Sequence, residues 1–265
     1  MNDAKNQSRI ANLSASQINL YLQCSLKYRF QYIDRLPKLF KPSGLAFGSV
    51  IHSALEWFNK ERVKGYKHSL EELLKIFEVD WFSQRVETDI RYKNGETQDS
   101  FLLMGKQMLT QYFHSNSANP VNAEIPFSLP LIEPMTGEVL GPTLDGIMDL
   151  IEENHTIVEF KTSAKTMNAD DANDSLQLTC YGYAYEMLFQ AKPRTLKIVD
   201  FVKTRTPKIV PLETTRNKRD IQRLFHLAKE ILHSINEGIF FPRSCYMCQD
   251  CEFEEPCKKW GGNHA

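Results

Sequence analysis

The sequence predicts an α/β fold in which helices precede a mixed central sheet and a cysteine-rich tail ends the chain. Three observations lead to this prediction. Apolar residues recur with helical spacing in the first part, strand-like segments and turns follow, and four of the six cysteines lie after residue 244. The 265 residues are expected to form one domain, with a helical part over 1–118, an α/β core over 119–237 and a metal-binding tail over 238–265 that packs on the N-terminal helix.

The elements of this fold can be placed from periodicity and capping signals. Ser14 or Ser16 can cap the first helix, and Ser69 with Glu72 forms the capping box of another. Helices are expected over residues 14–33, 46–63, 69–86, 100–114, 170–189 and 218–235. Strands are expected over residues 123–134, 144–153, 155–163, 196–204 and 208–214, the first three antiparallel, with a turn at residues 152–154.

The composition excludes some classes of protein. Apolar residues make up 42% of the chain and charged residues 25%, as in ordinary globular domains. No apolar stretch could span a membrane and the polar N-terminus has no apolar signal core, so we expect a cytoplasmic protein without a membrane partner. The 32 basic and 33 acidic residues nearly cancel, although residues 1–60 and 192–219 are locally basic. Such regions can bind a polyanion or can be ordinary solvated faces.

A candidate for chemistry lies in the second and third predicted strands. Asp149 ends the motif Gly-Ile-Met-Asp, and Glu159 and Lys161 follow in Glu-Phe-Lys. Glu159 and Lys161 are two apart in a strand, so their side chains share one face. Two converging carboxylates suit Mg²⁺ or Mn²⁺, and a lysine beside them can orient a water and neutralise charge on a phosphoryl group. On spacing alone, a surface hairpin with an ion pair explains the same residues.

Three other patterns are ambiguous when each is taken alone. His52 lies inside an amphipathic helix, where a histidine can be part of the core or can bind a metal. Gln177 and Tyr181 are four apart and share one helix face, but packing explains them equally well. Glu124, in the strand before the acidic hairpin, could approach a metal or cap a turn.

Taken together, the motifs resemble a known family. Gly48–His52, Gly146–Asp149, Glu159–Lys161 and Gln177–Tyr181 occur in this order between Cys24 and a final Cys-x2-Cys-x5-Cys segment. From about residue 13 to residue 257 the chain resembles the RecB-like branch of the PD-(D/E)XK nucleases. It is most similar to the iron–sulfur exonucleases associated with CRISPR adaptation and to the AddB nuclease domain. Met148 stands where the superfamily name has a proline, a position that the superfamily keeps loosely.

The resemblance implies a restriction-endonuclease-like core and a role for particular residues. The implied ligands of Mg²⁺ or Mn²⁺ are His52, Asp149, Glu159 and the carbonyl of Phe160. The implied catalytic set is Asp149, Glu159, Gln177, Tyr181 and Lys161, the last being the catalytic lysine. Gln177 and Tyr181 would lie near the DNA strand. Asp145 precedes Gly146, whereas the metal-binding Asp of the family follows that glycine, so Asp145 would lie outside the metal ligands.

The cysteines predict a second inorganic site. In the similar families, residues matching Cys24, Cys248, Cys251 and Cys257 hold a 4Fe–4S cluster that ties the tail to the first helix. Cys245 departs from that pattern, because it creates a second Cys-x2-Cys motif with Cys248. A structural Zn²⁺ site made of the four C-terminal cysteines is therefore the alternative.

The resemblance implies a metal-dependent DNA nuclease that hydrolyses phosphodiester bonds. Exonuclease action on single-stranded DNA or on DNA ends is expected, in repair, recombination or CRISPR adaptation. The alternative is an iron–sulfur module that binds DNA ends and acts mainly within a complex with a helicase or a CRISPR integrase. A zinc protein of unrelated function would require the acidic hairpin to be coincidental.

Overall fold

The protein is described by a computed structural model that covers residues 10–115 and 118–260. These residues form two compact units. The described residues of 39–126 and 147–215 make up the first, here called the sheet unit, and the other described residues make up the tail unit. The chain crosses between the units inside strands β4 (Pro120–Ile132) and β5 (Val139–Glu152). The single domain expected from the sequence stays a prediction.

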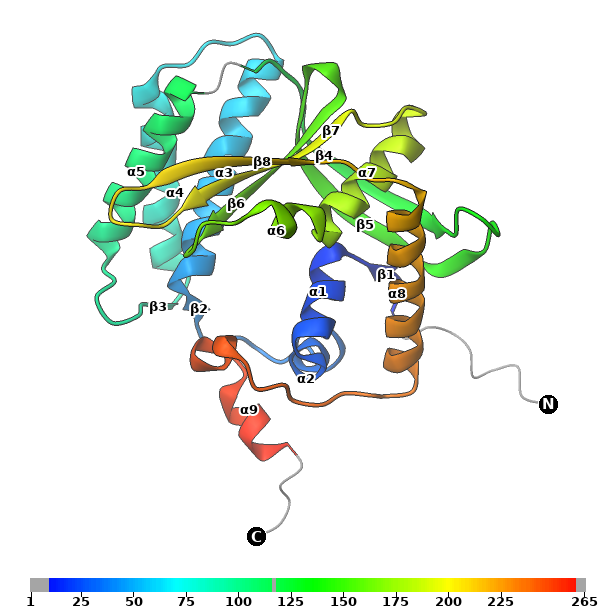
Figure 1. The fold of residues 1–265 in the computed structure, drawn as a ribbon. Coiled ribbons are helices and arrows are strands. Elements are labelled where there is room, and N and C mark those ends of the chain that lie inside the picture. Colours follow the sequence, from blue (N-terminus) through cyan, green and yellow to red (C-terminus); the bar gives the residue numbers. More distant parts are fainter. Residues whose placement is uncertain (1–9, 116–117, 261–265) are drawn as a thin grey trace, which may run out of the picture. The chain divides into compact units, whose positions relative to one another are not determined.

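The sheet unit is built on a mixed sheet (Figure 1). Its strands follow the order β5, β6, β7 and β8, and β4 pairs with β5. β6 (Thr156–Ser163) runs antiparallel to β5 and parallel to β7 (Thr195–Val202), and β8 (Lys208–Thr214) runs antiparallel to β7. The expected strands are therefore present with shifted ends. The turn expected between β5 and β6 is the short η2 (Glu153–His155).

Three helices cover one face of this sheet. α3 (Ser43–Val63), α4 (Leu70–Glu87) and α5 (Gln98–Ser115) lie side by side (Figure 1). The predicted capping box at the start of α4 is present, since Ser69 and Glu72 exchange both hydrogen bonds. The core between helices and sheet is rich in aromatic side chains, among them Phe47, Phe77, Trp81, Phe101 and Phe160. A short parallel pair, β2 (Lys41–Pro42) and β3 (Ile90–Arg91), lies beside α3.

The prediction of one continuous helix over residues 170–189 is wrong. The chain forms α6 (Ala169–Asn173) and then α7 (Leu176–Phe189), which contacts β6 and β7. Ser175 starts the second helix because its hydroxyl accepts a hydrogen bond from the Leu178 amide at 3.2 Å. The break allows α7 to begin independently of α6, and α7 carries Gln177 and Tyr181.

The helix expected over 14–33 is also interrupted, in the tail unit. α1 (Ala15–Gln23) is capped by Ser14 as predicted, and α2 (Ser25–Tyr28) continues into the π-helical turn η1 (Arg29–Ile33). Cys24 separates α1 from α2 in an extended conformation, with φ of −162° and ψ of 101°. Its sulfur accepts a hydrogen bond from the Lys27 amide at 3.4 Å and so caps α2.

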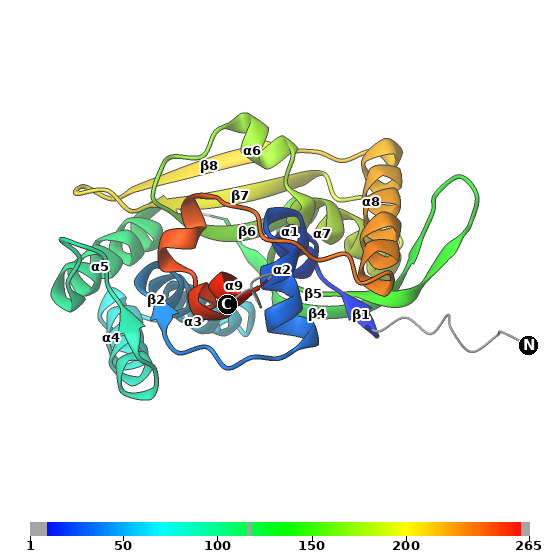
Figure 2. The same cartoon turned by 90° about the horizontal axis from the view of Figure 1, so that it is seen from below.

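The rest of the tail unit packs around these helices. β1 (Asn12–Leu13) pairs in parallel with β5 at residues 143–144, and α8 (Lys218–Asn236) contacts α1. The segment η3 (Tyr246–Asp250) and α9 (Glu254–Lys259) follows, and Figure 2 shows α9 beside α2. Leu26, Phe30 and Phe253 form a small core there. The C-terminal segment thus packs on α2 and η1 within this unit.

Among the described residues, no helix combines the length and the apolar character that crossing a membrane requires. The polar N-terminal segment that argued against a signal sequence includes residues 1–9, which lie outside the described residues.

Candidate functional site

The sheet unit brings the acidic hairpin together as predicted. Leu150 of β5 pairs with Val158 of β6, so Asp149 follows the same antiparallel register toward Glu159. Asp149 accepts a hydrogen bond on Oδ2 from the Phe160 amide at 2.8 Å, which fixes its carboxylate against β6. Val158 and Phe160 belong to the core under α3–α5, so the alternating Glu159 and Lys161 point to the other face.

A chain of polar contacts holds the ammonium group of Lys161. Lys161 Nζ forms an ion pair with Glu159 Oε1 and donates a hydrogen bond to Gln177 Oε1 at 2.5 Å. Gln177 Nε2 donates to the Tyr181 hydroxyl at 2.9 Å, and this hydroxyl donates to Asp149 Oδ1 at 3.4 Å. The two α7 residues that looked ambiguous in the sequence therefore link the lysine to Asp149, while the lysine contacts Glu159 directly.

His52 approaches the same carboxylates from α3. Its Nδ1 lies 3.5 Å from Asp149 Oδ2, and the ring also hydrogen-bonds with the main chain of Phe160. Gly48, one turn earlier, permits this approach, because a Cβ there would lie 3.0 Å from the Thr162 hydroxyl of β6. Burial lowers the pKa of His52, and Lys161 lowers it further against the opposing effect of Glu159. The imidazole is therefore biased toward its neutral, metal-binding form.

Burial and like charge dominate the electrostatics of the site. Glu159 is 1% exposed and Asp149 is 8% exposed. Burial, followed by the charge of Glu159, raises the pKa of Asp149 well above its ordinary range. Burial and the two nearby carboxylates also raise the pKa of Tyr181, which keeps its hydroxyl protonated as a donor. Within the described part of the chain, Glu159 Oε2 is buried and has no hydrogen-bond partner.

The donor set of this site fits a hard divalent cation. The carboxylates of Asp149 and Glu159 and the main-chain oxygen of Phe160 are the ligand types that Mg²⁺ and Mn²⁺ prefer, and a neutral His52 can complete the set. The unpartnered Glu159 Oε2 is the observation that fits best, since a buried carboxylate oxygen without a donor is costly unless a cation binds it. Among the described residues, no three His, Cys, Asp or Glu are already gathered as a metal site.

Two acidic residues near the site were undecided or missed in the sequence. For Glu124 of β4, the sequence left two roles open, approaching a metal or capping a turn. In the structure its charge acts on Asp149. Burial, followed by the charge of Glu56, raises the pKa of Glu124 to about 7. Glu56 was not singled out, although it lies four residues after His52 on the same helix face. That spacing was the feature of the sequence that could have indicated that Glu56 lies near His52.

Asp145, which was expected to lie outside the metal ligands, forms hydrogen bonds with other residues. Its carboxylate accepts hydrogen bonds from Asn12 at 2.6 Å and from Ser128 and Thr143 at 2.7 Å each. All four residues belong to the tail unit. Burial alone would raise the pKa of Asp145, but the three hydrogen bonds lower it overall.

Comparison with known proteins identifies the family of the chain. A family model described as the PD-(D/E)XK nuclease superfamily matches residues 12–258. The chain belongs to this superfamily. The match is to the superfamily as a whole rather than to its RecB-like branch. Membership implies hydrolysis of phosphodiester bonds in a DNA substrate, typically with Mg²⁺ or Mn²⁺.

Solved structures bear on the fold. The crystal structure of a candidate exonuclease from Eubacterium rectale aligns with a TM-score of 0.59 and 13% identity, over 96% of this chain and 89% of that chain. It shows that the two proteins share a fold over nearly the whole of this chain. A crystal structure of the protein SSO0001 aligns over 78% of this chain and 95% of its own at 16% identity, with a TM-score of 0.32. No protein with a curated description matches the chain.

The tail unit places four of the cysteines around one cavity. Cys24, Cys248, Cys251 and Cys257 line a cavity of about 220 Å³, together with apolar residues such as Phe30 and Phe253. Burial, followed by the charges of the other three thiols, raises the pKa of Cys257. Cys245 does not line this cavity, but its amide donates to the Cys248 sulfur at 3.4 Å. All six cysteines are free thiols, and Cys180 is buried in α7 as expected.

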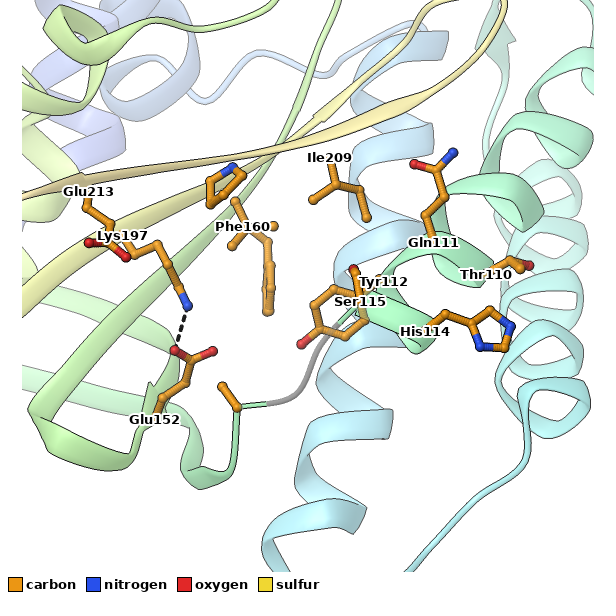
Figure 3. Close-up of a pocket in the computed structure, with 13 residues that line it drawn as sticks. Thr110, Gln111, Tyr112, His114, Ser115, Glu152, Phe160, Lys197, Ile209 and Glu213 are labelled. Atoms are coloured by element: carbon orange, nitrogen blue, oxygen red, sulfur yellow. Dashed lines mark hydrogen bonds and ion pairs between the residues drawn. The ribbon is translucent and has the colours of Figure 1, made fainter.

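A further cavity of about 780 Å³ lies between α5 and the sheet in the sheet unit. Figure 3 shows Lys197 and Glu152 pointing toward each other there, joined by an ion pair of 2.5 Å. Of the predicted site residues only Phe160 lines it, through the side chain that faces the α3–α5 core. The cavity is therefore separate in its lining from Asp149, Glu159 and Lys161.

Proposed function

We propose that this protein is a RecB-like, Mg²⁺- or Mn²⁺-dependent DNA exonuclease that acts on single-stranded DNA or on DNA ends. One observation carries the proposal: Lys161 is held between Glu159 and Gln177 beside a buried carboxylate oxygen that lacks a partner. A surface ion pair would not need such an arrangement, because exposed pairs are solvated and contribute little.

The residues would divide the work as follows. Asp149, Glu159, the Phe160 carbonyl and His52 would hold the cation, which would supply Lewis-acid activation of the phosphodiester and of water. Lys161 has a side chain that is 36% exposed, so its ammonium can reach both the carboxylates and an incoming phosphate. Gln177 and Tyr181 are positioning residues, since the first accepts from Lys161 and the second donates to Asp149.

The chain's own part in hydrolysis follows from these contacts. Lys161 would orient a water for attack and offset the negative charge that grows on the phosphoryl oxygens. A bond forms between the water oxygen and phosphorus, and the phosphorus–oxygen bond to the leaving nucleotide breaks. The leaving oxygen takes up a proton, and the attacking water loses one. Gln177 keeps the ammonium in place, so that the lysine does not collapse fully onto Glu159.

For the tail unit, we propose a 4Fe–4S cluster held by Cys24, Cys248, Cys251 and Cys257. The support is that these four thiols line a single cavity, whereas Cys245 is outside it. Four thiolates are the ligand set of such a cluster. The zinc alternative needs Cys245 as a ligand in place of Cys24.

The test is cleavage of end-labelled single- and double-stranded DNA by the anaerobically purified chain with Mg²⁺, Mn²⁺ or EDTA. Lys161→Ala should reduce cleavage on the order of 10³-fold while leaving the melting temperature near that of the wild type. The matched control is Lys197→Ala, which removes another sheet-unit lysine that is paired with Glu152 away from the carboxylates. Its cleavage rate per folded molecule should be unchanged.

Metal-dependent products that shorten from one end would support an exonuclease and give its polarity. Wild-type cleavage by Lys161→Ala would contradict the catalytic assignment. Binding of DNA by a cluster-loaded wild type that never cleaves would favour the DNA-end-binding module instead.

A further inference from the structure

The outer face of α4 carries three apolar side chains, here called the α4 stripe. Val79, Phe82 and Val86 are 55%, 62% and 72% exposed, and their spacing places them on one side of the helix. Phe77 and Trp81 of the same helix are buried in the aromatic core. α4 packs on α3 and α5 and lies further from the sheet than they do (Figure 2). The α4 stripe is therefore not used to hold α4 in the fold.

The α4 stripe has the spacing of a helix–helix contact. Together with the preceding Lys75, its residues are four, three and four positions apart, which is the a/d repeat of a coiled-coil seam. Single apolar residues on a surface need no explanation, but a continuous stripe marks an interaction site. Lys75 fits at the end of such a seam, because its alkyl stem can cover apolar surface while its ammonium stays in water. The matching surface is therefore another amphipathic helix.

Charges on one flank of the α4 stripe are complementary to the same flank of a second copy. Glu78 and Arg85 are one heptad apart, so both lie on the same side of the seam. When two copies of α4 pack antiparallel with Val79 against Phe82, Glu78 of each copy comes opposite Arg85 of the other. Two-fold symmetry makes this contact occur twice. A parallel pairing would put Glu78 opposite Ser83 instead, so the charges favour the antiparallel arrangement.

Both charged groups can take part in such a contact. Lys106 of α5 forms an ion pair with Oε1 of Glu78, which leaves Oε2 outside that pair on a side chain that is 42% exposed. The Arg85 guanidinium lies over the Phe82 ring, 5.8 Å from its centre, and its edge keeps donors for a carboxylate. Leu103, one turn before Lys106 on α5, is exposed and extends the apolar surface on this flank.

We propose that the α4 stripe is a homodimer interface, packed antiparallel on the same stripe of a second copy of this chain. A second copy fits better than an unrelated helix because the apolar spacing and the charge order complement themselves. The 18 residues of α4 span about 27 Å, so the interface is small and the dimer is weak, with a Kd on the order of 10 μM. Glu159 and Lys161 lie on the sheet face that α3–α5 do not cover, so each copy keeps its carboxylate site open.

The experiment is sedimentation velocity of the anaerobically purified full chain at about 1 to 100 μM, a range that brackets the expected Kd. The wild type should shift from monomer to dimer. Phe82→Glu should weaken association by at least about 100-fold, because it buries a carboxylate in the centre of the interface twice. Leu188→Glu is the matched control, since it makes the same change of charge at an exposed apolar residue of α7. It should associate like the wild type.

Exchange of the flanking charges tests the antiparallel arrangement. Glu78→Arg alone places like charges opposite each other at both contacts and should weaken association by at least about fivefold. The double variant, Glu78→Arg with Arg85→Glu, should return to within about twofold of the wild type, because the opposite charges face each other again. If Phe82→Glu does not fold, Val79→Glu provides the same test.

A wild type that stays monomeric throughout the concentration range would overturn the proposal. So would a dimer that persists in Phe82→Glu, or one that is lost equally in Leu188→Glu. A double variant as weak as Glu78→Arg would contradict the antiparallel pairing. Because the proposed nuclease function does not enter this measurement, loss of the dimer with unchanged DNA cleavage in Phe82→Glu would leave that function intact.

Discussion

The carboxylate site of the sheet unit and the cysteine cavity of the tail unit are two inorganic sites built in different ways. The first is placed on regular strands and a helix, and its groups contact one another through Lys161, Gln177 and Tyr181. The second is assembled from a helix break at Cys24 and a tail of short helical turns. The sheet unit has a large core of its own, whereas the core beside the cysteines is small.

This difference indicates what each inorganic group contributes. Buried like charges destabilise the metal-free sheet unit locally, but its aromatic core can maintain the fold. Around the cysteines, three core residues and the thiols hold the tail to α2, so a bound cluster would supply much of the local stability. Loss of the cation should therefore affect activity first, and loss of the cluster should affect folding first.

The largest expected effect on stability concerns the cysteine cavity of the tail unit. Cys24→Ser should lose bound iron and sulfide and lower the stability by at least about 2 kcal/mol, because a cluster that binds only the folded state stabilises it. Cys245→Ser is the matched control and should keep both iron and stability, since Cys245 lies outside the cavity. Metal analysis and thermal melting measure both.

The opposite pattern would contradict the cluster assignment. Zinc retained in Cys24→Ser and lost in Cys245→Ser would identify the four C-terminal cysteines as the ligands.

The next effect concerns the packing of α3 on β6. Gly48→Val should destabilise the protein by about 1–3 kcal/mol, because its side chain would collide with Thr162. It should also weaken Mn²⁺ binding, since His52 lies one turn further along the same helix. Gly44→Ala is the control: its nearest neighbour is the flexible end of Lys203 at 3.2 Å, which can move. Unchanged melting of Gly48→Val would refute the close-approach argument.

The smallest expected effect is a pH dependence of protein stability that arises at the carboxylate site. The pKa of Asp149 is raised in the folded state above its ordinary value of 3.8, through burial and the charge of Glu159. Above that pH the folded state holds a proton that the unfolded chain has lost, so the stability of the metal-free protein falls as the pH rises. Asp149→Asn removes this loss and should melt at a higher temperature than the wild type at pH 7–8.

The control for the pH effect is Glu153→Gln, which removes an exposed charge that accepts a hydrogen bond from Asn119 at 3.1 Å. Melting profiles from pH 4 to 8 in EDTA should coincide for this variant and the wild type. The groups that act on Asp149 are Glu159, Glu124, Lys161 and His52. A wild-type profile as flat as that of Asp149→Asn would show that the buried carboxylate carries no such penalty.

Sequence reasoning succeeded where local periodicity decides the outcome. Alternation along β6 put Glu159 and Lys161 on one face, and helical spacing put Gln177 beside Tyr181. It failed at the breaks at Cys24 and Ser175, because a thiol or a hydroxyl caps a new helix there without interrupting the apolar pattern. The role of Glu124 was open because the charged groups that act on it belong to α3 and β6, which are distant from it in the sequence.

The most direct test of the account compares Asp149→Asn and Cys24→Ser in one DNA-cleavage and melting experiment. Both variants and the wild type are incubated with the same end-labelled DNA and Mn²⁺ at a temperature at which each is folded. The account predicts that Asp149→Asn is inactive but stable, and that Cys24→Ser is destabilised but cuts at a rate near that of the wild type per folded molecule. Wild-type cleavage by Asp149→Asn would contradict the claim that the sheet-unit carboxylates carry the reaction.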